Sequence, residues 1–174
     1  ACRGLALEEV DGGIMENISI QNLTMMDVAA YPIYITTGKR NRGPNVTQPS
    51  RMRNILIANV IATGVEPMSG IQITGLPEQP IEGVRLENIR IVFQGGGTKE
   101  DAERVPPELG TRYPEPRNVG TMPAYGVFAR HVRDLELANI RVSFEKDDFR
   151  PAMVCVDVDG LEIDNFKAQL AAGV

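Results

Sequence analysis

A basic segment interrupts an otherwise acidic chain. Although the formal net charge is −5, no acid occurs between Asp27 and Glu66, and five cations lie within fifteen residues. These cations are Lys39, Arg40, Arg42, Arg51 and Arg53. Arginine binds carboxylates through two parallel hydrogen bonds, so the segment predicts a site for an anionic ligand such as a sugar acid, with Arg40 and Arg42 as contacts. The alternative is that these arginines pair with acids on neighbouring strands.

A second candidate for ligand contact lies in a long stretch later in the chain. The sequence Tyr113-Pro114-Glu115-Pro116 is stiff and carries an aromatic face beside a carboxylate. A sugar could stack on Tyr113 with Glu115 beside it; the alternative is a proline-ordered loop that packs over the fold. Earlier in this stretch the run 95–97 is all glycine, but no Lys-Ser/Thr pair follows it, so a flexible hinge is favoured over a phosphate cradle.

Paired carboxylates, the usual means of glycoside hydrolysis, are sparse. Asp157 and Asp159 would lie on one face of a strand, about 6–7 Å apart, but acids before a glycine are typically turn formers. Asp147 and Asp148 are interpreted as turn residues too, and Glu8 and Glu9 should point to opposite faces of a strand. His131 is the only histidine, so neither a histidine metal cluster nor a Ser/His/Asp set is expected.

The elements that must position these residues are predicted by an internal repeat. Five copies of one phrase occur, each with two aliphatic residues two apart, an asparagine two later and then an apolar residue. The asparagines are Asn22, Asn59, Asn88, Asn139 and Asn165. A second alternating segment accompanies each copy, at 4–7, 32–35, 70–73, 126–129 and 153–156. Alternation indicates strands rather than helices, and such repeats of short strands predict an all-β chain folded as a parallel β-helix.

The repeat predicts one partial β-helix domain over residues 1–174, with about five coils and two loop insertions, at 38–50 and 94–124. Insertions on a regular scaffold are where binding surfaces usually lie. One short helix is predicted, from Thr98 to Arg104 with Thr98 as N-cap. Stacked asparagines should form an amide ladder that satisfies buried polar groups. A leucine-rich repeat is the rival fold, but there the asparagine follows three residues after the last leucine rather than two.

Composition excludes several functions. The acidic charge argues against nucleic acid as the main partner, and no apolar run approaches the roughly 18 residues that span a bilayer. Cys2 and Cys155 are too few to indicate a disulfide framework and are expected to be small buried residues. No metal or cofactor is expected. We also expect the chain to be part of a longer β-helix, whose open end could cause self-association.

Several motifs resemble glycoside hydrolase family 28, the polygalacturonases and rhamnogalacturonan hydrolases. These motifs are Arg3-Gly4-Leu5, Gly12-Gly13 and the phrase 17–22, which resemble the downstream half of those enzymes. The segments 95–98, 113–116 and 130–132 resemble their bacterial branch. The resemblance covers essentially the whole chain. It implies a right-handed parallel β-helix that hydrolyses pectic polymers with inversion, through aspartates and without a metal.

The resemblance also has gaps. The family's Asn-Thr-Asp, Asp-Asp and Gly-His-Gly motifs precede its Arg-x-Lys motif, and here only the last has a counterpart, with Leu5 in place of the lysine. Arg3 matches the arginine that contacts the substrate carboxylate. The expectation is therefore a C-terminal part of a secreted or periplasmic pectin hydrolase that binds acidic polysaccharide and is inactive alone. The alternatives are a non-catalytic β-helix that binds acidic polysaccharide, and a lyase, which would need clustered acids for Ca²⁺.

Overall fold

The computed structural model describes residues 3–68 and 70–173, and the chain is nearly all-β, with 57% strand and 4% helix. Cys2 lies outside the described residues. The elements are β1 (Leu5–Glu9), β2 (Ile14–Met26), β3 (Ile33–Thr37), β4 (Arg51–Val65), β5 (Ile71–Thr74), β6 (Ile81–Gly95), α1 (Lys99–Ala102), α2 (Pro116–Val119), β7 (Val127–Lys146) and β8 (Met153–Ala168). Each segment that the repeat predicted as a strand overlaps one of these strands, but in each of the last two repeats the two predicted strands are one continuous strand, β7 or β8.

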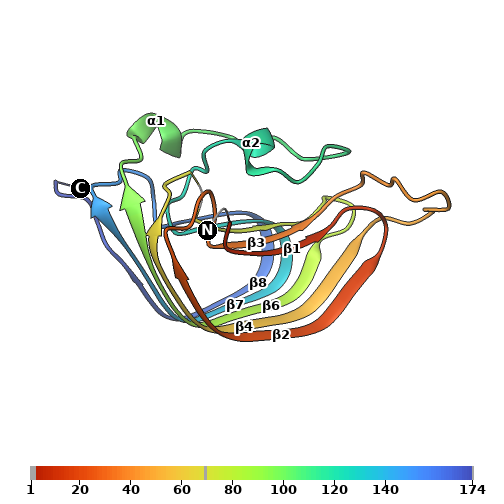
Figure 1. The fold of residues 1–174 in the computed structure, drawn as a ribbon, viewed down its shortest axis with the longest axis horizontal. Coiled ribbons are helices and arrows are strands. Elements are labelled where there is room, and N and C mark those ends of the chain that lie inside the picture. The colour runs from red at the N-terminus through yellow and green to blue at the C-terminus, as the bar shows by residue number, and fades with distance from the viewer. Residues whose placement is uncertain (1–2, 69, 174) are drawn as a thin grey trace.

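All pairings between these strands are parallel, and they build one sheet that nearly closes on itself. Its order is β1-β3-β5-β7-β6-β4-β2, and β8 pairs with β7 along most of its length. In Figure 1, β2, β4, β6, β7 and β8 curve side by side, while β1 and β3 cross above them. Each repeat of the sequence therefore lies in register against the repeat before it.

The repeated phrase bends each long strand at two places where the backbone has positive φ. The first column of such residues is Asn17, Asn54, Gly83, Asp134 and Gly160, and the second is Asn22, Asn59, Asn88, Asn139 and Asn165. Asparagine, aspartate and glycine tolerate this conformation best. It interrupts the strand alternation, so Ile20 and Leu23 both face the core although three positions separate them. The phrase is thus the sequence of a bent strand.

The core lies between the two sides of the folded sheet and consists of stacked aliphatic residues. Ile55, Ile57 and Val60 of β4 are at most 2% exposed. Corresponding residues of β8 are far more exposed, with Leu161 at 40% and Ile163 at 44%, because no further strand within the described part of the chain covers them. Burial of aliphatic side chains in the middle strands is therefore the main source of stability.

The predicted amide ladder exists, but its position differs from the prediction. Each asparagine of the second column after Asn22 donates through Nδ2 to Oδ1 of the asparagine in the preceding repeat, at 2.7–3.2 Å. All five side chains are exposed, so the ladder does not satisfy buried polar groups as expected. The reason is that a residue at an outward bend points its side chain away from the core. The ladder supports the bend from outside.

The two insertions lie where the spacing placed them. The loop 38–50 separates β3 from β4 as predicted, and residues 96–126 separate β6 from β7, two residues later than predicted. The helix predicted at Thr98 is shorter than expected, but Thr98 is its N-cap and forms a capping box with Asp101. In Figure 1 the segment with α1 and α2 lies above β1 and β3, on the side away from the curved strands.

Candidate functional site

The loops bring four of the five predicted contact residues together near β1. Arg3, directly before β1, forms an ion pair with Glu115 of the second insertion, and each side chain is 38% exposed. Tyr113, two residues before Glu115, lies under the guanidinium of Arg40, whose Cζ is 4.9 Å from the ring centroid. Three segments distant in sequence, around residues 3, 40 and 114, thus meet at one surface. We call Arg3, Arg40, Tyr113 and Glu115 the loop site.

An acid from the end of β1 fixes Arg40. The Nε atom of Arg40 donates to Oδ1 of Asp11 at 2.9 Å, and its Nη2 atom contacts the other carboxylate oxygen. The backbone N–H of Arg42 donates to the same carboxylate at 3.1 Å. The hydrogen bonds from Arg40 and Arg42 lower the pKa of Asp11 to about 2. Asp11 therefore remains ionised at any ordinary pH and holds the basic loop against the strand.

Acids of neighbouring segments partly neutralise the basic loop, the segment that carries Lys39 to Arg53. This agrees with the alternative prediction that its arginines pair with acids on neighbouring strands. Besides Arg40, Lys39 pairs with Glu78 at 2.7 Å, and Arg53 pairs with Glu16 at 2.5 Å. Among the described residues, Arg42 and Arg51 form no side-chain ion pair or hydrogen bond. Exposed ion pairs contribute only about 0–1 kcal/mol, so a ligand carboxylate can compete for Arg3, whereas Arg42 needs no displacement.

Sequence reasoning missed Glu8 and Tyr31, which extend the loop site along β1. The Tyr31 hydroxyl donates to Oε1 of Glu8 at 3.3 Å. Burial raises the pKa of Glu8, against the hydrogen bond from Tyr31 and the positive charge of Arg3, which lower it. The strand alternation predicted only that Glu8 and Glu9 point to opposite faces, and nothing in the sequence indicated that Tyr31 and Glu115 would lie near Glu8. Glu9 instead accepts N–H bonds from Asp11 and Gly13, as a turn residue.

A row of polar side chains continues from Glu8 beneath the second insertion. The strand register aligns Glu8 with Thr36, then Thr74, then Arg130. The hydroxyl oxygens of Thr36 and Thr74 are 2.9 Å apart. Arg130 is buried and donates to the carbonyls of Pro106 at 2.7 Å and Pro107 at 3.2 Å, and burial lowers its pKa. This row therefore anchors the insertion over the sheet.

Asp148 lies between β7 and β8 and accepts the backbone N–H of Arg150 at 3.1 Å, as expected of a turn residue, but it is buried. Asp148 and Arg150 form an ion pair with side chains 0% and 1% exposed. Asp148 also accepts the N–H of Gly97 at 3.1 Å, and Arg150 donates to the carbonyl of Met122 at 3.2 Å. A Cβ atom on Gly97 would lie 2.4 Å from Asp148 Oδ1, so this glycine makes room for the pair. The pair fixes both ends of the second insertion.

His131 and Asp157 form a separate polar group, distinct from the loop site. The ring nitrogens of His131 lie 2.6 Å from Asp157 and 3.1 Å from Glu108, and Arg133 also donates to Asp157. These hydrogen bonds lower the pKa of Asp157, which opposes a role as general acid with Asp159. Within residues 3–68 and 70–173, no three His, Cys, Asp or Glu side chains are grouped to hold a metal ion. No helix in these ranges is long and apolar enough to cross a membrane.

Comparisons with family models, curated proteins and solved structures found no match to this chain.

Proposed function

We propose that the chain is the C-terminal part of a pectin-degrading glycoside hydrolase with a right-handed parallel β-helix fold, and that the loop site contacts its acidic polysaccharide substrate. The observation that carries the proposal is the meeting of Arg3, Arg40, Tyr113 and Glu115 from three separate segments. Arg3 also stands in the motif that resembles family 28. In-register parallel strands that repeat along the chain support the β-helix.

The loop site offers the contacts that a sugar acid needs. The Tyr113 side chain is 45% exposed and can stack against a sugar ring, while Glu115 accepts hydrogen bonds from hydroxyl groups. Arg3 supplies positive charge for a sugar carboxylate, and Arg42, outside the loop site, adds to the positive charge of the basic loop. Arg40 has a different task from the one predicted, because Asp11 engages it bidentately and it supports the Tyr113 ring.

On this proposal the catalytic aspartates lie in a part of the enzyme outside residues 1–174. The reason is that the Asn-Thr-Asp, Asp-Asp and Gly-His-Gly motifs of the family have no counterpart in this sequence. Inverting hydrolysis needs one carboxyl group with a raised pKa and one carboxylate as base, about 6.5–9.5 Å apart. Asp11 and Asp157 have lowered pKa values and serve as ion-pair partners. The lowered pKa values and ion pairs of these aspartates are equally consistent with the second candidate function, a non-catalytic β-helix that binds acidic polysaccharide in a secreted or periplasmic setting.

A matched pair of aromatic substitutions tests the loop site. Tyr113→Ala removes an aromatic ring that is 45% exposed and packs against Arg40, while Phe149→Ala removes one that is 41% exposed and packs against Lys99. In calorimetric titrations with galacturonate oligomers, we expect Tyr113→Ala to weaken binding by about ten-fold, and Phe149→Ala to leave it unchanged. Equal affinities for the two variants would remove the loop site from the proposal.

An activity assay separates the two candidate functions. The chain alone should release no reducing sugar from polygalacturonate or rhamnogalacturonan, and release would refute the location of the aspartates. The longer gene product should cleave these polymers if the chain belongs to a hydrolase, and should only bind them if it is a binding module. Sedimentation of the chain alone tests self-association, which we propose to occur through the exposed apolar residues of β8, including Leu161 and Ile163.

A further inference from the structure

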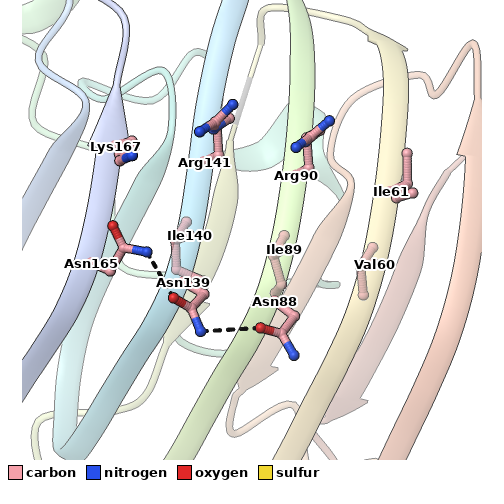
Figure 2. A pocket seen from close by; sticks show the side chains of 10 residues that line it. All are labelled: Val60, Ile61, Asn88, Ile89, Arg90, Asn139, Ile140, Arg141, Asn165 and Lys167. Carbon is pink, nitrogen blue, oxygen red and sulfur yellow. Dashed lines mark hydrogen bonds between the residues drawn. The ribbon is translucent and has the colours of Figure 1, made fainter.

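A second polar surface lies on the curved strands, beside the asparagine ladder. Here the residue two positions after the ladder asparagine is a cation in three successive strands: Arg90 in β6, Arg141 in β7 and Lys167 in β8. The register pairs Arg90 with Arg141 and Arg141 with Lys167. With Asn88, Asn139 and Asn165 these cations line a hollow of about 440 Å³. We call it the amide–cation groove, and Figure 2 shows its two parallel rows of side chains.

The three cations of this groove have no partner among the residues that the structure describes. All three side chains are exposed, and none forms an ion pair or hydrogen bond with another described residue. By contrast, Arg85, on the other side of the ladder in the same strand, contacts both Glu87 and Glu136. Parallel strands are about 4.8 Å apart, so the unpaired cations repel one another at close range. An anionic ligand would relieve this repulsion.

The adjacent ladder supplies neutral hydrogen-bonding groups. Each ladder amide uses one N–H of Nδ2 for its neighbour, as in Asn139 to Asn88 at 3.2 Å and Asn165 to Asn139 at 2.7 Å. An amide nitrogen carries two N–H groups, so each asparagine keeps a second donor for a ligand. Cations and amide donors therefore recur together, one of each per strand.

We propose that the amide–cation groove binds an extended acidic polysaccharide, a polyuronate, that runs across the strands. A polymer with one carboxylate and several hydroxyl groups on every sugar offers negative charge to the cations and hydrogen-bonding groups to the amides at a regular repeat along its length. Single-stranded nucleic acid fits less well, because the residues that line the groove include no aromatic side chain on which a base could stack. The choice of a polyuronate rests on the proposed function; the groove is separate from the loop site.

Two double variants of the full 174-residue chain test this groove. R90Q/R141Q removes two unpaired arginines from it, and the control R53Q/R85Q removes two exposed arginines that pair with acids elsewhere on the curved strands. Binding of octagalacturonate at low salt should weaken by about ten-fold in R90Q/R141Q and by less than about two-fold in the control. The salt dependence of binding should also become shallower in R90Q/R141Q only. Circular dichroism checks that both variants fold.

The following outcomes would overturn the proposal. Equal losses in the two double variants would mean that net charge alone attracts the oligomer, and no loss in R90Q/R141Q would exclude the groove. Tighter binding of poly-dT than of octagalacturonate would exclude the polysaccharide. Tyr113→Ala separates the two sites. Loss of binding in that variant alone supports the loop site and refutes the groove. Loss of binding in R90Q/R141Q alone supports the groove and refutes the loop site.

Discussion

The buried pair of Asp148 and Arg150 should be the most sensitive polar contact of the fold. Asp148 accepts from Arg150 Nε at 2.9 Å, Nη2 at 2.7 Å and the backbone N–H at 3.1 Å, and from Gly97 N at 3.1 Å. Arg150 itself has only one further described acceptor, the carbonyl of Met122. Asp148→Asn keeps the size of the side chain and removes its charge. The arginine then remains buried without a counter-ion.

The expected cost of Asp148→Asn is about 3–5 kcal/mol in the free energy of unfolding, the range for breaking a buried ion pair. Arg150→Met should cost less, because the remaining carboxylate keeps two backbone N–H donors, from Gly97 and from residue 150. In the double variant D148N/R150M the losses should not add, and the coupling should exceed about 1 kcal/mol, since neither charge is left alone.

Urea unfolding at neutral pH, followed by circular dichroism, measures these free energies. Arg53→Gln is the control, because its ion pair with Glu16 is largely exposed and should contribute less than about 1 kcal/mol. A loss below about 1 kcal/mol for Asp148→Asn would refute the reasoning, as would a double variant whose loss equals the sum of the single losses. A small loss would mean that water reaches Arg150 when its partner is removed, and additive losses would mean that the two charges are not coupled.

Three further predictions concern the ladder, the basic loop and the free thiol. Asn88→Leu should lower the free energy of unfolding, measured in urea, by about 1–3 kcal/mol, because φ of residue 88 is 53° and leucine tolerates this conformation poorly. Asn88→Gly should cost less, because glycine adopts positive φ readily. Equal costs for the two variants would mean that only the lost hydrogen bonds matter. The Asp11 carboxyl should titrate in NMR with a pKa of about 2, so its ion pair with Arg40 persists at neutral pH and is lost as the pH falls through that value. Arg40→Gln should raise the pKa of Asp11 toward about 3.9. An unchanged pKa would contradict the role of the Arg40 hydrogen bonds. Burial raises the pKa of the Cys155 thiol. In a Cys2→Ser variant, the thiol of the folded chain should therefore react with a disulfide reagent more slowly than the thiol of the unfolded chain. Equal rates in the two states would show that the thiol is accessible in the fold.

The regular part of the fold could be predicted from sequence because each of its features has a local cause. Alternation located the strands, and the asparagine of each phrase marked a bend that only a few residue types tolerate. Loop 38–50 followed from spacing alone, and Thr98 was recognised as a helix cap from its own residue type. The repeat also set the register, so the asparagines could be expected to stack.

The features that could not be predicted depend on contacts between distant segments. Whether the ladder faced the core or solvent depended on the direction of the bend, which the phrase does not encode. The burial of Asp148 and Arg150 was not predicted, because Asp148 contacts Gly97 and Arg150 contacts Met122, both far away in sequence. The loop arginines could equally have been free or paired, and only the fold shows that Asp11 engages Arg40 while Arg42 has no side-chain ion pair among the described residues.

The two proposed sites differ in a way that follows from how they are built. The loop site comes from insertions that occur once, so Tyr113 and Arg3 can each contact a single sugar and set its identity. The amide–cation groove comes from the repeat, so a residue type that recurs in sequence becomes a row with the spacing of the strands. Such a row gains affinity only from a ligand that is itself periodic. The monomer galacturonate should therefore bind the loop site but not the groove, and octagalacturonate both; a monomer that competes with the oligomer for Arg90 and Arg141 would contradict this division.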